Sequence, residues 1–314
     1  MKQETFEIEA EYEGERLDKY LSVIFEQSES TSNAPSRSFF QKLIKDGHVT
    51  VNDSQEKANY RLHMDDLVCV EIPDAVETPI LPENIPLDIL YEDDDLLVVN
   101  KPKGMVVHPS AGHYSGTLVN AVMFHCKDSL SGINGEIRPG IVHRIDMDTT
   151  GSLIVCKNDE SHVNIAEQIK EHTVNRIYVG IVCGNVTEDE GTIEGAIGRH
   201  PVDRKKMAVN EKNGKPAITH YKVLERFGNY TYMQFRLETG RTHQIRVHMA
   251  SIGHPLLGDT LYSSGRSPFK HLQGQTLHAK TIGFVHPKSG EYMEFSAPLP
   301  EYFDNLLKLL KSMS

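Results

Sequence analysis

The sequence has 314 residues, of which 39% are hydrophobic and 25% charged, values typical of a folded globular protein of about two domains. Acidic residues outnumber basic ones by 44 to 33, giving a formal net charge of −11. These values exclude a collagen-like, coiled-coil or wholly disordered chain, and no apolar run approaches the ~20 residues that a membrane helix needs. The acidic start, MKQETFEIEAEYEGERLDKY, lacks the apolar stretch of a signal peptide, so a cytoplasmic location is expected.

Charge is uneven along the first part of the chain. Residues 1–30 hold nine acidic and three basic residues, and the balance then turns basic. Ser36 predicts the N-cap of a helix over RSFFQKLIKDG, with Gly47 just beyond its end. A spacing of four residues gives this helix a polar, mainly cationic side with Arg37, Gln41, Lys42 and Lys45, and the residues expected to pack inward are Phe39, Phe40, Leu43 and Ile44.

Two strands are predicted after this helix, HVTVN and LVCVEI (67–72), from their alternating apolar residues. Four prolines within residues 73–88 argue against regular structure there. We therefore expect a small α/β domain with an acidic N-terminal extension at 1–73, a Pro-rich linker at 74–88 and a second domain at 89–314.

The second domain is predicted to mix strands and helices without a regular βαβ repeat. ILYEDDDLLVVNKP predicts two strands around an acidic turn, and IYVGIVCG and TYMQFRLE predict further strands. Helical patterns occur at TLVNAVMFH, at SHVNIAEQIKEH, where Asp159 is the expected cap, and at EYFDNLLKLLKSM. This order favours an α+β fold with a mixed, largely antiparallel sheet and flanking helices.

The segment IVHRIDMDTTG (141–151) is the first candidate site. An apolar strand end leads into a polar, Gly-terminated turn, which presents its side chains at a surface or cleft. Arg144 and Asp146 are two residues apart and can point the same way from an extended segment. A neighbouring guanidinium favours an ionised carboxylate, which can act as nucleophile or base. Taken by spacing alone, an Asp before Thr-Thr-Gly is more often a turn or cap residue.

The segment 237–259 is the second candidate, and a helix is expected over residues 242–251. His243 and His248 are five residues apart with no glutamate between them, so a zinc motif is weakly supported. The segment is either a basic face that meets phosphate or pairs an Arg with a carboxylate, or an ordinary solvated helix. Its cationic or titratable residues are Arg241, His243, Arg246, His248 and His254.

Two further features are weaker. Residues 199–215 concentrate basic side chains in a hairpin-like excursion, a composition that suits phosphate contact or an ordinary solvated loop. Tyr178 lies in the middle of a predicted strand, where it either packs or stacks on a planar ligand. The chain has no GxGxxG, GxxxxGK[ST], GxSxG or CxxC motif, which leaves nucleotide-cofactor, P-loop, serine-hydrolase and zinc-ribbon chemistry without support.

The motifs resemble a known family. HRIDMDTTG resembles the HRLDxxTSG motif of the RluA family of RNA pseudouridine synthases, GRTHQIRVHMASIGHPLLGD is similar to that family's second signature, and YEDDDLLVVNKPKGMVVHP is similar to its opening strands. ERLDKYL…SRSFFQKLIKDGHVTVND…DDLVCVEI is similar to an S4 RNA-binding domain. The matches follow the family's order over nearly the whole chain. The departures are Ile145 for Leu, Thr150 for Ser, and Arg176 and Gly180 where Lys and Ala are more common.

The resemblance implies an isomerase that converts uridine to pseudouridine within RNA, without a cofactor or metal. The base is detached at N1, rotated and rejoined through C5. By motif position Asp146 is the catalytic carboxylate, and attack on the base, attack on the ribose and proton removal are all open roles for it. Arg246 would pair with Asp146, Tyr178 would stack on the extruded uracil, and Arg144 would hold the flipped nucleotide or fill the space it leaves.

The same resemblance gives RNA an expected path over the chain, with phosphate contacts from the S4-like helix, the basic loop and the rim of the catalytic cleft. The candidate RNA-binding residues are Arg37, Lys42, Lys45, Lys101, Lys103, Arg204, Lys205, Lys206 and Arg241.

Within the family, the S4 segment and VNKPKGMVVHP look most like the D type that acts on ribosomal RNA. The expected target is therefore a uridine in a stem-loop of large-subunit (23S) ribosomal RNA, free or in pre-ribosomal particles, with tRNA as the alternative. We expect a monomer with no membrane or DNA partner. A noncatalytic RNA-binding or ribosome-assembly factor and a histidine-rich metallohydrolase are the competing functions.

Overall fold

The computed structural model describes residues 2–28, 36–72, 80–110, 112–127, 129–133, 139–203, 205–263, 269 and 272–314. The chain divides into two compact units, Met1–Thr78 and Pro79–Ser314, and each has its own buried core. Residues 74–79 of the predicted linker lie outside the described residues. Ile80 and Leu87, from its second half, pack against the core of the second unit.

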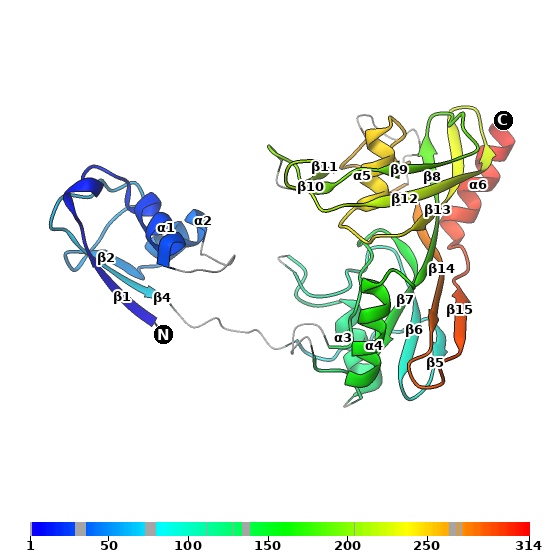
Figure 1. Cartoon of the computed structure of the whole chain (residues 1–314), viewed down its shortest axis with the longest axis horizontal. Coiled ribbons are helices and arrows are strands. Elements are labelled where there is room, and N and C mark those ends of the chain that lie inside the picture. The colour runs from blue at the N-terminus through cyan, green and yellow to red at the C-terminus, as the bar shows by residue number, and fades with distance from the viewer. Residues whose placement is uncertain are drawn as a thin grey trace. The chain divides into compact units, whose positions relative to one another are not determined.

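The N-terminal unit is a four-stranded antiparallel sheet with two helices (Figure 1). The strand order is β1-β4-β2-β3. Its elements are β1 (Lys2–Glu7), the short 3-10 helix η1 (Ala10–Tyr12), α1 (Leu17–Ser28), α2 (Arg37–Lys45), β2 (Val49–Val51), β3 (Ser54–Gln55) and β4 (Leu67–Ile72). The strands predicted over HVTVN (48–52) and LVCVEI (67–72) are thus confirmed, the first as the shorter β2.

The acidic N-terminus corrects one expectation. It is an integral edge strand and not an extension, because β1 pairs along its whole length with β4, from Lys2 opposite Ile72 to Glu7 opposite Leu67. Alternation lets the strand place Phe6 against the core, while Gln3, Thr5 and Glu7 on the other face are exposed.

Helix α2 follows its predicted boundaries. The Ser36 side chain accepts a hydrogen bond from the Phe39 amide, and Gly47 adopts a left-handed φ of +84° beyond the C-cap. Phe40, Leu43 and Ile44 are buried. Phe39 is 37% exposed, so its predicted inward packing is wrong. The inward stripe i, i+3, i+4 contains the other three residues and leaves position 39 to one side.

The second unit is built on a nine-stranded sheet in the order β5-β6-β7-β14-β8-β13-β12-β9, with β15 paired to β14. Among its described pairs, β14–β7 is parallel and the others are antiparallel. The strands are β5 (Ile89–Glu92), β6 (Leu96–Lys101), β7 (Thr150–Cys156), β8 (Asn175–Cys183), β9 (Glu190–Glu194), β12 (Ile218–Arg226), β13 (Tyr230–Leu237), β14 (Leu277–Val285) and β15 (Tyr292–Ser296), beside a separate hairpin of β10 (Ile197–Arg199) and β11 (Met207–Val209).

Among the described residues of this unit, four helices flank the sheet, and Figure 1 shows their arrangement. They are α3 (Leu118–Cys126), α4 (Asp159–Lys170), α5 (Gln244–Ser251) and α6 (Glu301–Met313). The cap of α4 was predicted one residue late. Asn158 accepts the hydrogen bond from the Ser161 amide at 2.9 Å, whereas the Asp159 carboxylate accepts hydrogen bonds from Ser131 and Gly132.

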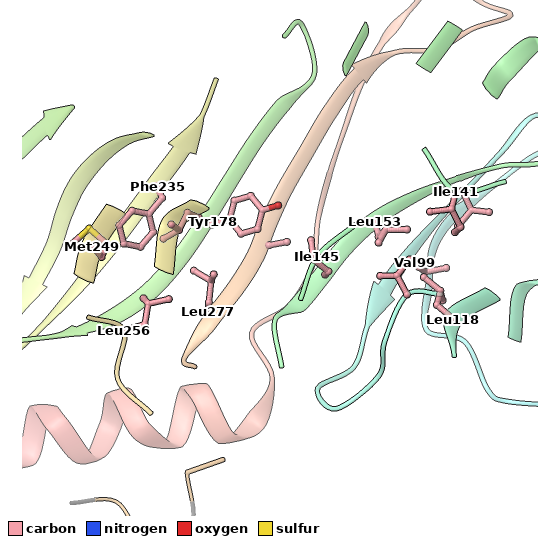
Figure 2. Packing of buried hydrophobic residues seen from close by; sticks show 14 of the residues in the cluster. Val99, Leu118, Ile141, Ile145, Leu153, Tyr178, Phe235, Met249, Leu256 and Leu277 are labelled. Carbon is pink, nitrogen blue, oxygen red and sulfur yellow. The ribbon is translucent and has the colours of Figure 1, made fainter. Parts of the chain in front are cut away.

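The main core is formed by the central strands together with residues of α3 and α5. Figure 2 shows Tyr178 of β8 beside Ile145 and Leu277, with Phe235 and Met249 on its far side. The mixed, largely antiparallel sheet with flanking helices confirms the predicted fold class. Among the described helices, none is long and apolar enough to span a bilayer.

Candidate active site

Asp146 lies in the irregular segment that leads into β7. An isolated bridge between Ile141 and Val155 anchors the start of this segment. The Asp146 carbonyl accepts a hydrogen bond from the Thr149 amide at 3.1 Å, and the next carbonyl, that of Met147, accepts one from a lysine at 3.0 Å. The backbone that carries the carboxylate is therefore held on both sides.

That lysine is Lys101, and its predicted contact with RNA is wrong. The residue is 1% exposed, and its Nζ donates to the carbonyls of Pro102, Met105 and Met147 at 2.8, 2.8 and 3.0 Å. Burial lowers the pKa of Lys101 to about 7. Since all three ammonium protons are used inside the protein, none is left for a phosphate.

Arg246 of α5 joins Asp146 to a second carboxylate. Its Nη1 donates to Oδ2 of Asp146 at 2.8 Å. Its Nε and Nη2 form a fork on Asp259, at 2.7 and 3.0 Å. Asp259 is 1% exposed, whereas the Asp146 side chain is 19% exposed. The structure thus brings Asp146 and Arg246 into direct contact and places a buried anchor behind them.

The electrostatics of this triplet fix the charge of Arg246. Burial alone would lower the pKa of Arg246, but its hydrogen bonds to Asp259 and the charge of Asp146 outweigh burial and raise it. Asp259 Oδ1 also accepts hydrogen bonds from the amides of Leu261 and Tyr262. Because Asp259 holds two arms of the guanidinium, the third arm is directed at Asp146.

The other oxygen of Asp146, Oδ1, accepts no hydrogen bond from the described residues. His243 Nε2 lies 3.9 Å from it, which is too far for a hydrogen bond. Asp146 therefore keeps one oxygen available to a ligand in the cavity it lines.

His243 is oriented by Tyr262. The Tyr262 hydroxyl accepts a hydrogen bond from the Met207 amide at 2.9 Å and lies 2.8 Å from His243 Nδ1. We assign the hydroxyl proton to the bond with Nδ1, which leaves the ring's own proton on Nε2, the nitrogen nearest Asp146. Burial lowers the pKa of His243, which favours the neutral ring. His243 thus offers a hydrogen-bond donor on the cavity side.

Tyr178 forms an apolar wall of the same cavity, which has a volume of about 510 Å³. The residue is 8% exposed and packs with Ile145 and Leu277 (Figure 2). Burial raises the pKa of Tyr178, so its hydroxyl stays protonated at neutral pH. The cavity is in the size range of small-ligand sites, with Asp146 on one side and an aromatic residue on another.

Two predicted cationic residues line this cavity as well. Arg144 is exposed, and its Nη1 lies 3.3 Å from His108 Nε2. Arg241 donates from Nε to the Pro216 carbonyl at 3.0 Å. Since a guanidinium has five N–H donors, both residues can also donate to an anionic ligand in the cavity.

The remaining RNA-binding candidates are dispersed. Arg37 is bound to Asp18 in the N-terminal unit, and Lys103 Nζ lies 4.1 Å above the Tyr302 ring. Arg204 lies outside the described residues. Lys42, Lys45 and Lys205 are exposed, and Lys206 is partly buried.

Sequence reasoning missed Asp259, Tyr262 and Arg176 as members of this site. Asp259 follows Leu256, Leu257 and Gly258, and an acid beside such an apolar segment needs a cation if it is buried. That signal was available in the sequence. The contact of Tyr262 with His243 depends on the path of the loop after α5, and sequence spacing does not determine it.

Among the described residues, the histidines of the second candidate segment belong to no group with metal-ligand spacing. His248 is buried and contacts Thr219 Oγ1 at 2.9 Å and the Gly195 carbonyl at 3.1 Å. Elsewhere, ligand atoms of Asp93, Asp95 and His286 lie within 4.8 Å of one another. Asp93 already accepts hydrogen bonds from Tyr91, from the Asp95 and Leu96 amides and from His286. We therefore interpret this group as a turn that is stabilised by hydrogen bonds.

Comparison with known proteins gives consistent results. A family model described as RNA pseudouridylate synthase matches residues 95–251, and the S4 domain model matches residues 30–68. The chain is 51% identical over 301 residues to the RNA pseudouridine synthase YlyB of Bacillus subtilis, covering 96% of each chain. It is 44% identical over 308 residues to ribosomal large subunit pseudouridine synthase D of Zymomonas mobilis, covering 95% of this chain and 94% of that one.

A solved structure shows the same fold. Human RNA pseudouridylate synthase domain containing 1 superimposes with a TM-score of 0.56 at 25% identity, over 77% of this chain and 98% of that one.

Proposed function

Since this chain belongs to the RNA pseudouridylate synthase family and carries an S4 domain, we propose that it isomerises a uridine of large-subunit ribosomal RNA and that Asp146 is its catalytic carboxylate. The target uridine would leave its stack and enter the cavity lined by Asp146 and Tyr178, because the reacting bond is otherwise hidden.

One observation carries the assignment of Asp146. Its Oδ2 is held by Arg246, while its Oδ1 accepts no hydrogen bond from the described residues and borders the cavity. A carboxylate fixed on one oxygen and uncommitted on the other is suited to attack or to proton transfer on a bound base or ribose. Tyr178, on another wall, offers a ring on which uracil can stack.

The reaction needs groups that the cavity contains. The N1–C1′ bond of uridine breaks, the base rotates, and C5 joins C1′. The proton on C5 leaves and N1 gains one, so the reaction is an isomerisation with no net change in composition. Asp146 would attack the ribose at C1′, attack the base or remove the proton from C5, and His243 would donate from Nε2 to a base or ribose oxygen.

Two observations support ribosomal RNA as the target. Relatives at 42–44% identity over nearly the whole chain carry the name ribosomal large subunit pseudouridine synthase D. The S4 domain presents two exposed lysines, Lys42 and Lys45, on α2, which suits phosphate contacts on structured RNA.

The direct test is Asp146→Asn in the full chain, assayed on transcribed large-subunit ribosomal RNA and on tRNA. We expect pseudouridine formation to fall by about 10³-fold or more, with RNA affinity within about threefold, since Asn can still accept from Arg246. Asp148→Asn, which removes the same charge two residues away, is the matched control and should keep normal activity. Normal conversion by Asp146→Asn would remove Asp146 from its role.

Target choice is tested by mapping pseudouridines across cellular RNA with and without the gene. Loss of a site in large-subunit ribosomal RNA is the expected result. Loss confined to tRNA would correct the target, and RNA binding without loss of any pseudouridine would favour an assembly factor.

A further inference from the structure

Arg176 is a second arginine of the same cavity. It precedes Tyr178 by two residues on β8, so both side chains lie on one face of the strand. Both line the cavity with Asp146. Arg176 is 7% exposed, and burial lowers the pKa of its guanidinium, although it remains a cation at neutral pH.

The hydrogen bonding of Arg176 is incomplete. Its Nη2 donates to the Glu238 carbonyl at 2.9 Å, while its Nε has no hydrogen-bond partner. Among the described residues no carboxylate pairs with it, in contrast to Arg246, which has two. A buried cation without a counter-charge is strongly unfavourable unless a ligand uses it.

The guanidinium is nevertheless held in place. A Cβ added to Gly240 would lie 2.6 Å from Arg176 Nη1, so the glycine provides the space in which the group sits against the backbone. With Glu238 on one arm and Gly240 beside another, the cation is oriented before any ligand binds.

Isomerisation of uridine places negative charge where this cation can act. When the N1–C1′ bond breaks, its electron pair stays with the base and spreads over N1, O2 and O4. The charge disappears once C5 bonds to C1′, the C5 proton leaves and N1 is protonated. A donor that contacts a carbonyl oxygen of the ring stabilises this transient charge more than neutral uridine.

We propose that Arg176 is a further catalytic residue, whose guanidinium donates to a uracil carbonyl oxygen and stabilises the negative charge on the base during the exchange. The inference rests on the proposed function and adds the group that receives the charge of the detached base. Removing Arg176 should therefore lower kcat far more than it raises KM.

The test crosses a protein change with a change of substrate atom. Arg176→Met and the unaltered protein are assayed on short target RNAs carrying uridine, 2-thiouridine or 4-thiouridine at the single reactive position. Arg176→Met should lower kcat by about 10²–10³-fold on uridine. Sulfur at the contacted position should slow the unaltered protein about tenfold more than the variant. Equal sulfur effects in both proteins, at both positions, would overturn the proposal.

Three further variants serve as controls for this test. Gly240→Ala moves the guanidinium while keeping its charge, and should lower kcat without loss of thermal stability. This variant replaces Arg176→Met as the test if Arg176→Met fails to fold. Arg176→Lys keeps the charge and should recover at least a tenth of the kcat. Arg236→Met removes an exposed arginine of neighbouring β13 and should match the unaltered protein. Full kcat in Gly240→Ala together with Arg176→Met would also overturn the proposal. If the unaltered protein forms no pseudouridine, the proposed function itself fails.

Discussion

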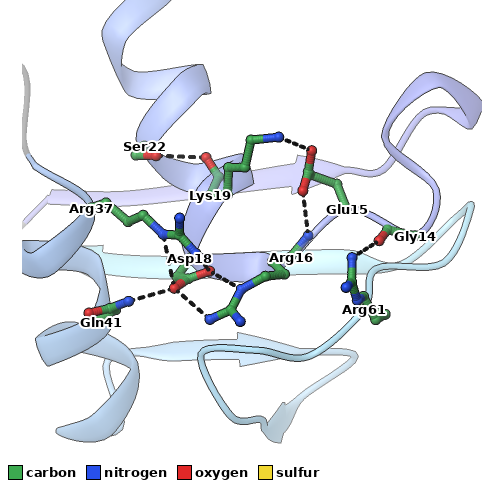
Figure 3. A network of polar contacts seen from close by, with 9 residues as sticks. All are labelled: Gly14, Glu15, Arg16, Asp18, Lys19, Ser22, Arg37, Gln41 and Arg61. Atoms are coloured by element: carbon green, nitrogen blue, oxygen red, sulfur yellow. Dashed lines mark hydrogen bonds and ion pairs between the residues drawn. The ribbon is translucent and has the colours of Figure 1, made fainter.

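The two units each hold a carboxylate among arginine side chains and use it in opposite ways. In the N-terminal unit, Asp18 is fully buried and accepts five hydrogen bonds from Arg16, Arg37 and Gln41 (Figure 3). In the second unit, Asp146 is partly exposed and accepts one side-chain hydrogen bond, from Arg246, among the described residues. Both oxygens of the Asp18 carboxylate accept hydrogen bonds and we call this carboxylate saturated, whereas Asp146 has one oxygen that accepts none from the described residues.

The ratio of cations to carboxylates is also reversed between the two clusters. Two cations surround Asp18, whereas Arg246 is shared by two carboxylates, Asp146 and Asp259. Burial alone would raise the pKa of Asp18, but the hydrogen bonds from Arg16, Gln41 and Arg37 lower it to about 2. The comparison teaches that a carboxylate with every lone pair occupied stabilises the fold, while one held on a single oxygen remains able to react.

Removing the shared cation should have the largest effect. Arg246→Met leaves the buried Asp259 without a counter-charge, so we expect a loss of about 3–5 kcal/mol in the free energy of unfolding, with pseudouridine formation abolished. Adding Asp259→Asn should restore part of the stability, because the uncompensated charge is gone, without restoring activity. Chemical denaturation and a pseudouridine assay on the single and double variants separate the two effects. Equal stability of both would show that Asp259 is not the buried anchor.

Asp18→Asn tests the saturated carboxylate. Asn cannot satisfy two guanidinium groups, so we expect the N-terminal unit to lose about 2–3 kcal/mol of stability, less than for a wholly buried pair because both arginines reach solvent. Hydrogen exchange of the β1–β4 amides in the full chain measures this loss. Asp46→Asn, an exposed position at the end of α2, should show none. Unchanged hydrogen-exchange protection of these amides in Asp18→Asn would show that Asp18 does not stabilise the N-terminal unit.

The sequence predicted much of the fold because local patterns specify it. Helix α2 was bounded by Ser36 and Gly47, and the alternation in LVCVEI matched β4. Edge strand β1 was missed because it begins an acidic, largely polar segment, and its partner, β4, lies about sixty residues later. Pairing over that separation is a tertiary property.

The residues of the candidate site likewise separate into those that local motifs predict and those that depend on tertiary packing. Asp146, Tyr178 and Arg246 stand in recognisable motifs, so their positions could be expected to meet. The errors and omissions concern burial: Lys101 was taken for a surface cation, and Arg176 was noted as a departure from the family pattern and given no role. Whether a cation faces solvent, a carbonyl or a cavity depends on packing between β6, β8 and α5, which residue order alone does not reveal.

The lowered pKa of Asp18 predicts a pH dependence confined to acid. Its ordinary pKa of 3.8 falls to about 2 in the fold, so the stabilisation is fully present above about pH 4 and is lost as the pH falls through about 2. The difference corresponds to about 2 kcal/mol. Denaturation of the N-terminal unit between pH 5 and 2 should show this slope, and Asp18→Asn should remove it. An identical slope in the variant would assign the acid sensitivity to other carboxylates.

The smallest effect is expected from substitutions on the cationic side of α2, where an engaged arginine can be compared with exposed lysines. Arg37 is engaged by Asp18, while Lys42 and Lys45 are exposed and form no ion pair with the described residues. Lys42→Ala should therefore weaken RNA binding severalfold and reduce the salt dependence of binding by about one phosphate contact, with stability unchanged within about 0.5 kcal/mol.

Arg37→Ala is the matched comparison, because it should reduce stability and RNA affinity together. Titrations of ribosomal RNA at several salt concentrations, paired with thermal unfolding, distinguish the two variants. If Lys42→Ala leaves the salt dependence unchanged while Arg37→Ala lowers it, the RNA contact lies on the arginine that Asp18 orients, and the saturated network then serves binding as well as folding.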